Sequence, residues 1–180
     1  LDRNELTSGS TFHSAGLVGQ LRADPTLTLM NMHSVDLYRK LQQTETPPSW
    51  RECGSIKLAS TPERMQEIRR QIGWAKTFGL DLKEISPKEA QDLFPLIDLE
   101  GVVGACYMAS DGQVDPSQLA MALAAGARRQ GVQIFTHTRV LEIKTTNGRV
   151  SSVVTDKGEI ECEIVVNCGG MYAPQIARMV

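Results

Sequence analysis

The chain has 180 residues, of which 41% are hydrophobic, and its 19 Lys and Arg against 21 Asp and Glu give a formal net charge of −2. This length can bury one good core and a small second lobe, while the even scatter of charge provides no basic face for nucleic acid or an acidic membrane surface. No apolar run approaches the roughly 20 residues of a membrane span, and no signal segment opens the chain. We therefore expect neither nucleic acid nor membrane as a partner.

The first two thirds of the chain contain clear helix-start signals. Asp24, followed by Pro25, predicts a helix that ends near Thr44. Thr61 before a proline starts a second predicted helix, which Gly79 is well placed to end. Between them, the run CGSIKLAS alternates polar and apolar residues with the period of a half-buried strand.

Two later helix starts have fuller signals. In SPKE, Ser86 can accept a hydrogen bond from the backbone N–H of Glu89 while the Glu89 side chain reaches back, and DPSQ repeats this arrangement with Asp115 and Gln118. Each cap is worth about 1 kcal/mol. The second cap opens the stretch PSQLAMALAAGARRQG, whose small residues allow a helix to lie close against a sheet.

After these helices the pattern changes to strands. Residues 132–137, VQIFTH, predict a short strand, and RVLEIKT, RVSSVVT and EIECEIVVN follow as a meander with tight turns at an Asn-Gly pair and a Lys-Gly pair. Residues 164–166 are a continuous apolar run, which predicts a strand buried on both faces as in a parallel sheet. The sequence NCGG then leads into a last helical segment, residues 172–179.

The four cysteines form no Cys-x-x-Cys pair and lie in apolar, strand-like surroundings. This pattern favours reduced, partly buried thiols in a cytosol-like compartment over a disulfide framework. We therefore expect no metal site.

The NCGG turn is the first pointer to a ligand. A buried strand that ends in Gly169 and Gly170 and runs into a helix is typical of a nucleotide-binding sheet, because glycines let the backbone approach a ligand. Such a turn alone does not identify the ligand, and the sequence contains neither GxGxxG nor GxxxxGK[ST].

The chain contains five ordered blocks: LDRNELTSGSTFHSAGL, GSIKLASTPERM, ISPKEAQDLFPL, DGQVDPSQLAMALAAGARRQGVQI and VVNCGGMYA. In order and spacing, these blocks resemble the flavin domain of the dimethylglycine and sarcosine dehydrogenases, a branch of the D-amino-acid oxidase-like flavoproteins. The resemblance covers nearly all of the chain and implies a mixed α/β fold. Residues 1–23 and 115–180 would form a partial FAD-binding, Rossmann-like sheet with a β-meander, and residues 24–114 a segment of the substrate lobe.

The resemblance implies FAD as the cofactor and gives roles to particular residues. Asp2 occupies the position of an acidic residue that accepts hydrogen bonds from the ribose hydroxyls, which suits a carboxylate facing a diol. Gly9, Ser10 and Thr11 match the loop that passes the pyrophosphate and the flavin, where backbone N–H groups and hydroxyls can bind an anion. The alternatives are a surface aspartate in a loop and an ordinary turn closed by a hydroxyl.

His13 matches the histidine of the family motif WHAAGL, which is bonded covalently through a ring nitrogen to the 8α carbon of the flavin. Neutral imidazole offers a nucleophilic nitrogen for such a bond. Here Phe12 replaces the common tryptophan and Ser14 the common alanine. The alternative is a histidine that packs against a noncovalent flavin or donates to a carbonyl.

Three further positions follow from the resemblance. Val140 matches the position whose backbone meets the adenine edge. Gly169 and Gly170 match the turn NCAG near the pyrophosphate and the ribityl chain, with Gly169 in place of the usual alanine. In the motif DGHIDP, Gln113 replaces the histidine, which puts the preferred amine in question.

The implied reaction removes a hydride from an N-methyl carbon of sarcosine, dimethylglycine or a similar small amine to flavin N5. The resulting iminium hydrolyses to formaldehyde or passes its carbon to a folate held in a C-terminal domain. The resemblance identifies no catalytic residue within these 180 residues. It implies a location in the bacterial cytoplasm or the mitochondrial matrix.

The resemblance also predicts an incomplete sheet. The family strand that bears GxGxxG and the strand beside it lie outside this sequence, and the gap would expose apolar faces and unpaired backbone edges. That exposure would cost more than the roughly 5–15 kcal/mol of net stability that a domain has. We therefore expect an internal fragment, inactive alone, whose missing strands come from the rest of the chain or from a partner chain.

Two other classes of protein stay open. The family includes a catalytically silent regulatory subunit of the pyruvate dehydrogenase phosphatase, which TDKGEIECE and GVQI resemble, but its members lack the flavin-bonding histidine and His13 argues against it. The other class is a stand-alone substrate-lobe fold without a redox role, which only the small size supports.

Overall fold

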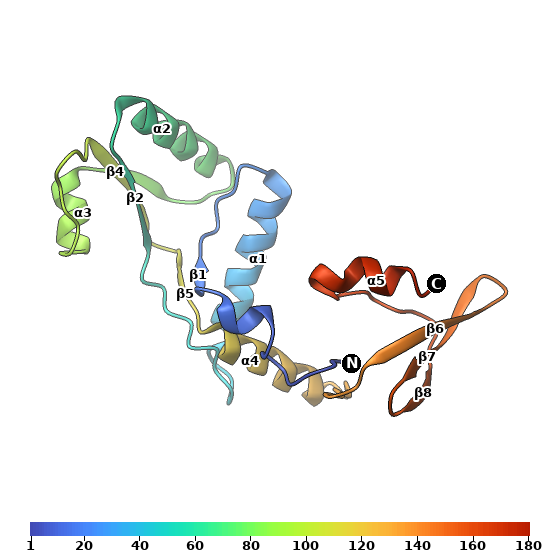
Figure 1. The fold of residues 1–180 in the computed structure, drawn as a ribbon. Coiled ribbons are helices and arrows are strands. Elements are labelled where there is room, and N and C mark those ends of the chain that lie inside the picture. The colour runs from blue at the N-terminus through green and yellow to red at the C-terminus, as the bar shows by residue number, and fades with distance from the viewer. The chain divides into compact units, whose positions relative to one another are not determined.

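The computed structural model describes residues 1–180. Helices alternate with short antiparallel sheets, so the predicted mixed α/β class is confirmed (Figure 1). The chain divides into two compact units, one of residues 1–12 with 124–180 and one of residues 13–123.

The unit of residues 13–123 contains most of the helices. Its elements, in chain order, are β1 (Leu17–Val18), α1 (Pro25–Leu41), β2 (Ser55–Ala59), α2 (Pro62–Thr77), β3 (Leu82–Ile85), α3 (Pro87–Leu93), β4 (Gly104–Met108), β5 (Gly112–Gln113) and the first part of α4 (Pro116–Arg129). The other unit contains β6 (Val140–Thr146), β7 (Arg149–Thr155), β8 (Gly158–Glu161) and α5 (Ala173–Ala177), with the 3-10 turn η2 (Gly170–Tyr172). A second 3-10 turn, η1 (Ser10–His13), lies where the two units join along the chain.

The predicted starts of α1 and α2 are confirmed by their caps. The Asp24 carboxylate accepts a hydrogen bond from the Leu27 N–H at 2.9 Å, and the Thr61 hydroxyl accepts one from the Arg64 N–H at 3.2 Å. Gly79, directly after the end of α2, has a φ of +73°, a conformation that glycine adopts without steric cost. The first helix ends three residues before its predicted end near Thr44.

The predicted start of α3 is confirmed in full, and that of α4 differs from its prediction in one hydrogen bond. Ser86 and Glu89 form both bonds of a capping box, at 3.2 Å and 2.7 Å. Asp115 accepts a hydrogen bond from the Gln118 N–H at 2.9 Å, but the Gln118 side chain bonds the Ser49 hydroxyl instead of reaching back. The second capping box is therefore half formed. The Gln118 side chain instead connects α4 to the loop that precedes β2.

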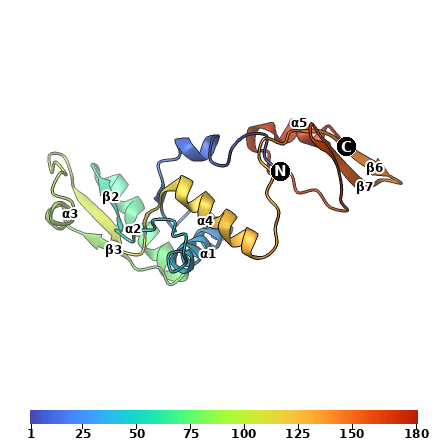
Figure 2. The same ribbon diagram turned by 90° about the horizontal axis from the view of Figure 1, so that it is seen from below.

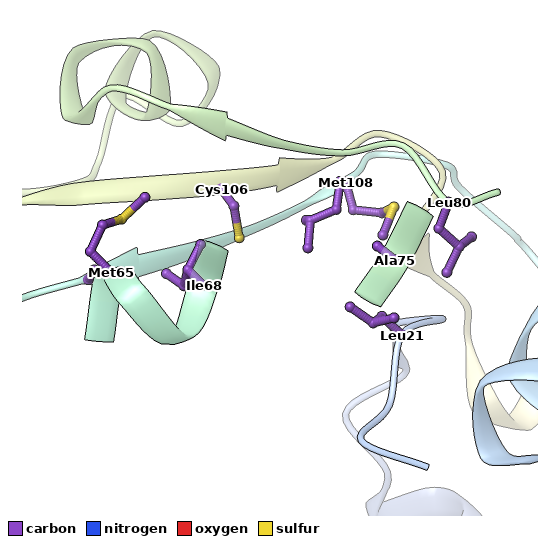
Figure 3. Close-up of a cluster of buried hydrophobic side chains, with 9 residues drawn as sticks. Leu21, Met65, Ile68, Ala75, Leu80, Cys106 and Met108 are labelled. Carbon is purple, nitrogen blue, oxygen red and sulfur yellow. The ribbon is translucent and has the colours of Figure 1, made fainter. Parts of the chain in front are cut away.

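The sheet β2-β4-β3 packs one face on α2, which fixes the first core (Figure 2). Met65 and Ile68 of α2 lie against the strand that carries the buried Cys106 (Figure 3). The register pairs Cys106 with Lys57, so Lys57 shares the helix side of the sheet. The alternation in CGSIKLAS would bury Leu58, which is instead 36% exposed; the strand is confirmed, but its apolar side faces away from α2.

A second core holds the short ladder β1-β5 in place. Val35, Trp50 and Val114 form its buried centre. The backbone at Gly112 lies so close to the segment around Arg51 that a Cβ at this position would be 2.1 Å from the Arg51 carbonyl oxygen. Only glycine fits this position.

The other unit is built on the predicted meander, β6-β7-β8. Asn147 and Gly148 have φ values of +54° and +74°, as a type I′ hairpin turn requires. The second turn is formed by Asp156 and Lys157, one residue earlier than predicted, because Gly158 already pairs with Thr155 as the first residue of β8.

Two predicted strands are wrong. Residues 132–137 form no strand, although the Val132 and His137 N–H groups donate to the Ala127 and Asn4 carbonyls and the Phe135 carbonyl accepts from the Asp2 N–H. Residues 164–166 form no strand either, and Ile164 and Val166 are 79% and 78% exposed. A strand needs backbone partners, and no strand of the described residues pairs with this run.

None of the helices combines the length and the apolar character that crossing a bilayer requires.

Candidate functional site

Asp2 is held by its backbone and leaves its carboxylate at the surface. The Asp2 N–H donates to the Phe135 carbonyl at 2.9 Å, and the Asp2 carbonyl accepts from the Thr138 N–H at 2.8 Å. Carboxylate Oδ1 accepts a hydrogen bond from the Asn4 N–H at 2.9 Å. The side chain is exposed, and Oδ2 keeps its capacity to accept further bonds.

The segment from Ser8 to Thr11 is an open turn. The Ser8 N–H and hydroxyl both donate to the Glu5 carbonyl, at 3.3 Å and 2.7 Å. Gly9 and Ser10 are exposed, and a Cβ on Gly9 would meet no atom within 4 Å. Backbone groups here are accessible to a ligand, although the bonds of Ser8 also fit the ordinary hydroxyl-closed turn.

His13 is the last residue of η1 and the first residue of the unit 13–123. Its side chain is exposed, and the neighbouring Phe12 is exposed as well. The position of an aromatic residue beside an accessible imidazole is compatible with a role at a planar cofactor.

Val140 and the diglycine turn lie in the same unit as Asp2. Val140 opens β6 opposite Thr155, two residues after the Thr138 N–H that bonds Asp2. Gly170 has a φ of +54° with open space where a side chain would begin. A Cβ on Gly169 would lie 2.5 Å from Cδ1 of Ile176, so an alanine at this position would require the Ile176 side chain to move.

Asn167 holds the diglycine turn and was not among the residues predicted from the sequence. Its Oδ1 accepts a hydrogen bond from the Gly169 N–H at 3.1 Å, and its Nδ2 donates to the Ala173 carbonyl at 2.9 Å. Asn167 thereby fixes both ends of the diglycine turn. An asparagine two residues before a glycine pair is a turn signal that could have identified it.

The structure brings only some of the predicted residues together. All except His13 lie in the unit of residues 1–12 and 124–180. The Asp2 backbone bonds Phe135 and Thr138, which precede Val140 in the chain. The neighbouring Arg3 contacts Tyr172, two residues after Gly170. No hydrogen bond links Gly9, Ser10 or Thr11 to these positions. The predicted roles of all eight residues therefore stay predictions.

Two hollows of the surface lie elsewhere. One of about 730 Å³ lies on the meander and one of about 500 Å³ lies between α2 and the segment before α1. Their lining residues include none of the predicted site residues. No group of three or more His, Cys, Asp or Glu side chains is placed to hold a metal ion.

The fold is that of an oxidoreductase. The structure superimposes on L-proline dehydrogenase from P. horikoshii with a TM-score of 0.93 and 30% identity, over 98% of this chain and 47% of that chain. Residues 1–180 match the DAO family, FAD dependent oxidoreductase, and the chain belongs to this family. The resemblance to dimethylglycine and sarcosine dehydrogenases is confirmed.

Two curated relatives show the range within the family. The mitochondrial pyruvate dehydrogenase phosphatase regulatory subunit of Mus musculus is 36% identical over 98% of this chain and 20% of its own length. The mitochondrial dimethylglycine dehydrogenase of Rattus norvegicus is 33% identical over 100% of this chain and 21% of its own length. The chain thus spans about a fifth of these relatives.

The residues present fit the FAD on which this family depends. Asp2 offers an exposed carboxylate for a diol, and the backbone at Gly9 and Gly170 is open to close approach by an anion. The Asn167 bonds hold the diglycine turn in one conformation.

Proposed function

We propose that this chain is part of an FAD-dependent oxidoreductase that oxidises small N-methyl amines such as sarcosine or dimethylglycine. The observation that supports this most is the family match over residues 1–180, together with 33% identity to a dimethylglycine dehydrogenase. FAD, when bound, supplies the acceptor for the hydride that leaves the N-methyl carbon. The chain's own residues bind and orient the cofactor.

The binding roles proposed for the unit of residues 1–12 and 124–180 rest on the family resemblance. Asp2 accepts from the ribose diol, and the backbone of residues 9–11 and of Gly169 and Gly170 donates to the pyrophosphate. Val140 presents its backbone to the adenine edge. These roles are supported by the exposed carboxylate and the open glycines.

His13 holds the flavin covalently through a ring nitrogen in this proposal. The test is to denature the FAD-loaded protein in acid and look for flavin fluorescence that stays with the protein band. We expect His13→Ala to lose this band, while His33→Ala, which changes an exposed histidine of α1, retains it. Release of free FAD from the unmodified protein would overturn the tether.

Gln113 is proposed to influence the choice of amine. It lies opposite Leu17 on one side and bridges Arg51 on the other, and all three side chains are exposed. Residues directly opposite in a ladder share a face, so an amide, a guanidinium and an apolar side chain adjoin there. This surface offers hydrogen-bond donors to a carboxylate and an apolar contact to a methyl group.

Further strands are proposed to complete the sheet beside residues 164–166. The support is the exposure of Ile164 and Val166 and the length of the relatives. These strands come from a longer form of the chain or from a partner chain. We expect residues 1–180 to bind FAD only when an upstream strand, glycine-rich turn and helix are supplied; a tight, stoichiometric FAD complex of residues 1–180 alone would contradict this.

The finer features of the reaction and location are part of the same proposal. The one-carbon unit leaves as formaldehyde or passes to a folate in a further domain, and product analysis with and without tetrahydrofolate separates these outcomes. The relatives from mouse and rat are named mitochondrial, which favours the mitochondrial matrix; the other candidate is the bacterial cytoplasm. Cell fractionation tests the location.

A catalytically silent regulatory protein is the second candidate function. It is supported by the 36% identity to the mouse regulatory subunit. His13 favours the enzyme, because the resemblance implies that silent members lack this histidine. A protein that binds no flavin and oxidises no N-methyl amine would favour the regulatory candidate.

A further inference from the structure

Arg3 and Tyr172 form a contact between two segments that are far apart in the sequence. Cζ of Arg3 lies 4.2 Å from the centroid of the Tyr172 ring. Both residues belong to the unit of residues 1–12 and 124–180. A guanidinium at this distance over an aromatic face is attracted by the ring's quadrupole.

Each partner of this contact is fixed to a predicted cofactor segment. Arg3 directly follows Asp2, whose backbone is bonded on both sides by Phe135 and Thr138. Tyr172 ends η2, and its N–H donates to the Gly169 carbonyl at 2.9 Å. The contact therefore joins the segment that carries Asp2 to the segment that ends the diglycine turn.

We infer that Arg3 and Tyr172 are positioning residues, a clasp that sets the separation between the Asp2 carboxylate and the backbone of Gly169 and Gly170. The inference rests on the proposed function, since it assigns Asp2 to the ribose and the diglycine turn to the pyrophosphate. A dinucleotide cofactor spans a fixed distance between these groups. A surface that already holds that spacing loses less conformational freedom when the cofactor binds.

The clasp can be measured without flavin. The Ala173 N–H donates to the Gly170 carbonyl, so its hydrogen exchange reports on the turn. In the FAD-free full-length protein, we expect Arg3→Gln and Tyr172→Leu each to speed this exchange by about two- to fivefold, the range of an exposed cation–π contact. The double variant should be no faster than either single variant. Equal exchange in all variants, or independent effects that multiply in the double variant, would overturn the clasp.

The second readout is the dissociation constant for FAD, measured in the same variants combined with His13→Ala so that no covalent bond to the flavin can form. We expect each single variant to raise it by about two- to fivefold, with no further rise in the double variant. Arg3→Lys and Tyr172→Phe keep the cation and the ring and should leave both readouts unchanged. Arg149→Gln removes an exposed positive charge from the first residue of β7 and controls for net charge.

The two readouts separate the inference from the proposed function. Coupled hydrogen exchange with an unchanged FAD dissociation constant would overturn the positioning role. Asp2→Asn with unchanged FAD binding would instead contradict the proposed role of Asp2, whatever the exchange experiment gives.

Discussion

The carboxylate of Asp111 accepts a hydrogen bond from the backbone N–H of Gln20 at 2.9 Å. Its other oxygen accepts from the Ser55 hydroxyl at 2.6 Å, and Asp111 is only 4% exposed. One buried carboxylate thus joins the segment after β1, the start of β2 and the turn before β5. This junction fixes the segment that follows His13 to the sheet β2-β4-β3.

Asp111→Ala is expected to lower the free energy of unfolding by about 3 kcal/mol, because it leaves the buried Gln20 N–H and the half-buried Ser55 hydroxyl without their partner. Urea unfolding followed by circular dichroism measures this. Asp81→Ala, at an exposed position, serves as the control and should change the value by less than about 1 kcal/mol. Equal losses in both variants would contradict the role of the junction.

The capping box of α3 predicts the direction in which the folding stability changes with pH. The hydrogen bond from the Ser86 backbone, with a contribution from its hydroxyl, lowers the pKa of the Glu89 carboxyl below its ordinary value. The charged form is thus favoured in the folded state, so the stabilisation is present above the ordinary pKa and is lost as the pH falls through the lowered one.

Glu89→Gln keeps a neutral acceptor for the Ser86 N–H and cannot titrate. We expect the unmodified protein to be the more stable of the two at pH 7 and the difference to vanish at pH 3. Urea midpoints at the two pH values check this. A difference that is the same at both values would show that the charge of Glu89 contributes nothing.

Gly112 and Gly73 should respond oppositely to alanine. Gly112→Ala places a Cβ 2.1 Å from the Arg51 carbonyl oxygen and is expected to prevent the β5 pairing, with a loss of several kcal/mol. Gly73 lies within α2, and a Cβ there meets no atom within 4 Å. Gly73→Ala should therefore stabilise by about 0.5–1 kcal/mol. Thermal unfolding of both variants distinguishes the two outcomes.

Gln113→His is expected to change the ratio of kcat/KM for dimethylglycine and sarcosine, because it replaces an amide by an imidazole beside Arg51. Steady-state kinetics with both amines measures the ratio. Gln43→His, at an exposed position after α1, controls for an added histidine. An unchanged ratio in Gln113→His would remove Gln113 from the proposed substrate surface.

Local signals predicted much of this fold because their physical causes are local. The Asp24 and Ser86 caps and the Asn147 turn depend on residues within four positions and formed as expected. The burial of Leu58 depends on the register of the sheet, because the pairing of Lys57 with Cys106 decides which face of β2 meets α2. Whether residues 164–166 form a strand depends on partner strands, and no local sequence pattern shows whether these are present.

The candidate site shows the same division. The family blocks nominated Asp2, His13 and Gly170 as candidates. Asn167 and the Arg3 contact were missed, because a single asparagine or arginine has many ordinary roles at a surface. Only the folded turn shows that Asn167 bonds both the Gly169 N–H and the Ala173 carbonyl.

Asn167→Ala removes both bonds that hold the diglycine turn, and we expect it to weaken FAD binding by about tenfold, as the loss of roughly 1–2 kcal/mol of hydrogen bonding implies. Asn167→Asp keeps the acceptor for the Gly169 N–H but loses the donor to Ala173, and its added negative charge would lie near the proposed pyrophosphate. It should therefore bind FAD no better than Asn167→Ala. Fluorescence titration with FAD measures both in the full-length protein that carries His13→Ala, so that binding is reversible. Asn4→Ala is the control, because the Asn4 side chain forms no hydrogen bond. Because the turn is fixed by side-chain bonds rather than by a strand ladder, unchanged FAD binding in Asn167→Ala would mean that the diglycine turn does not contact the cofactor.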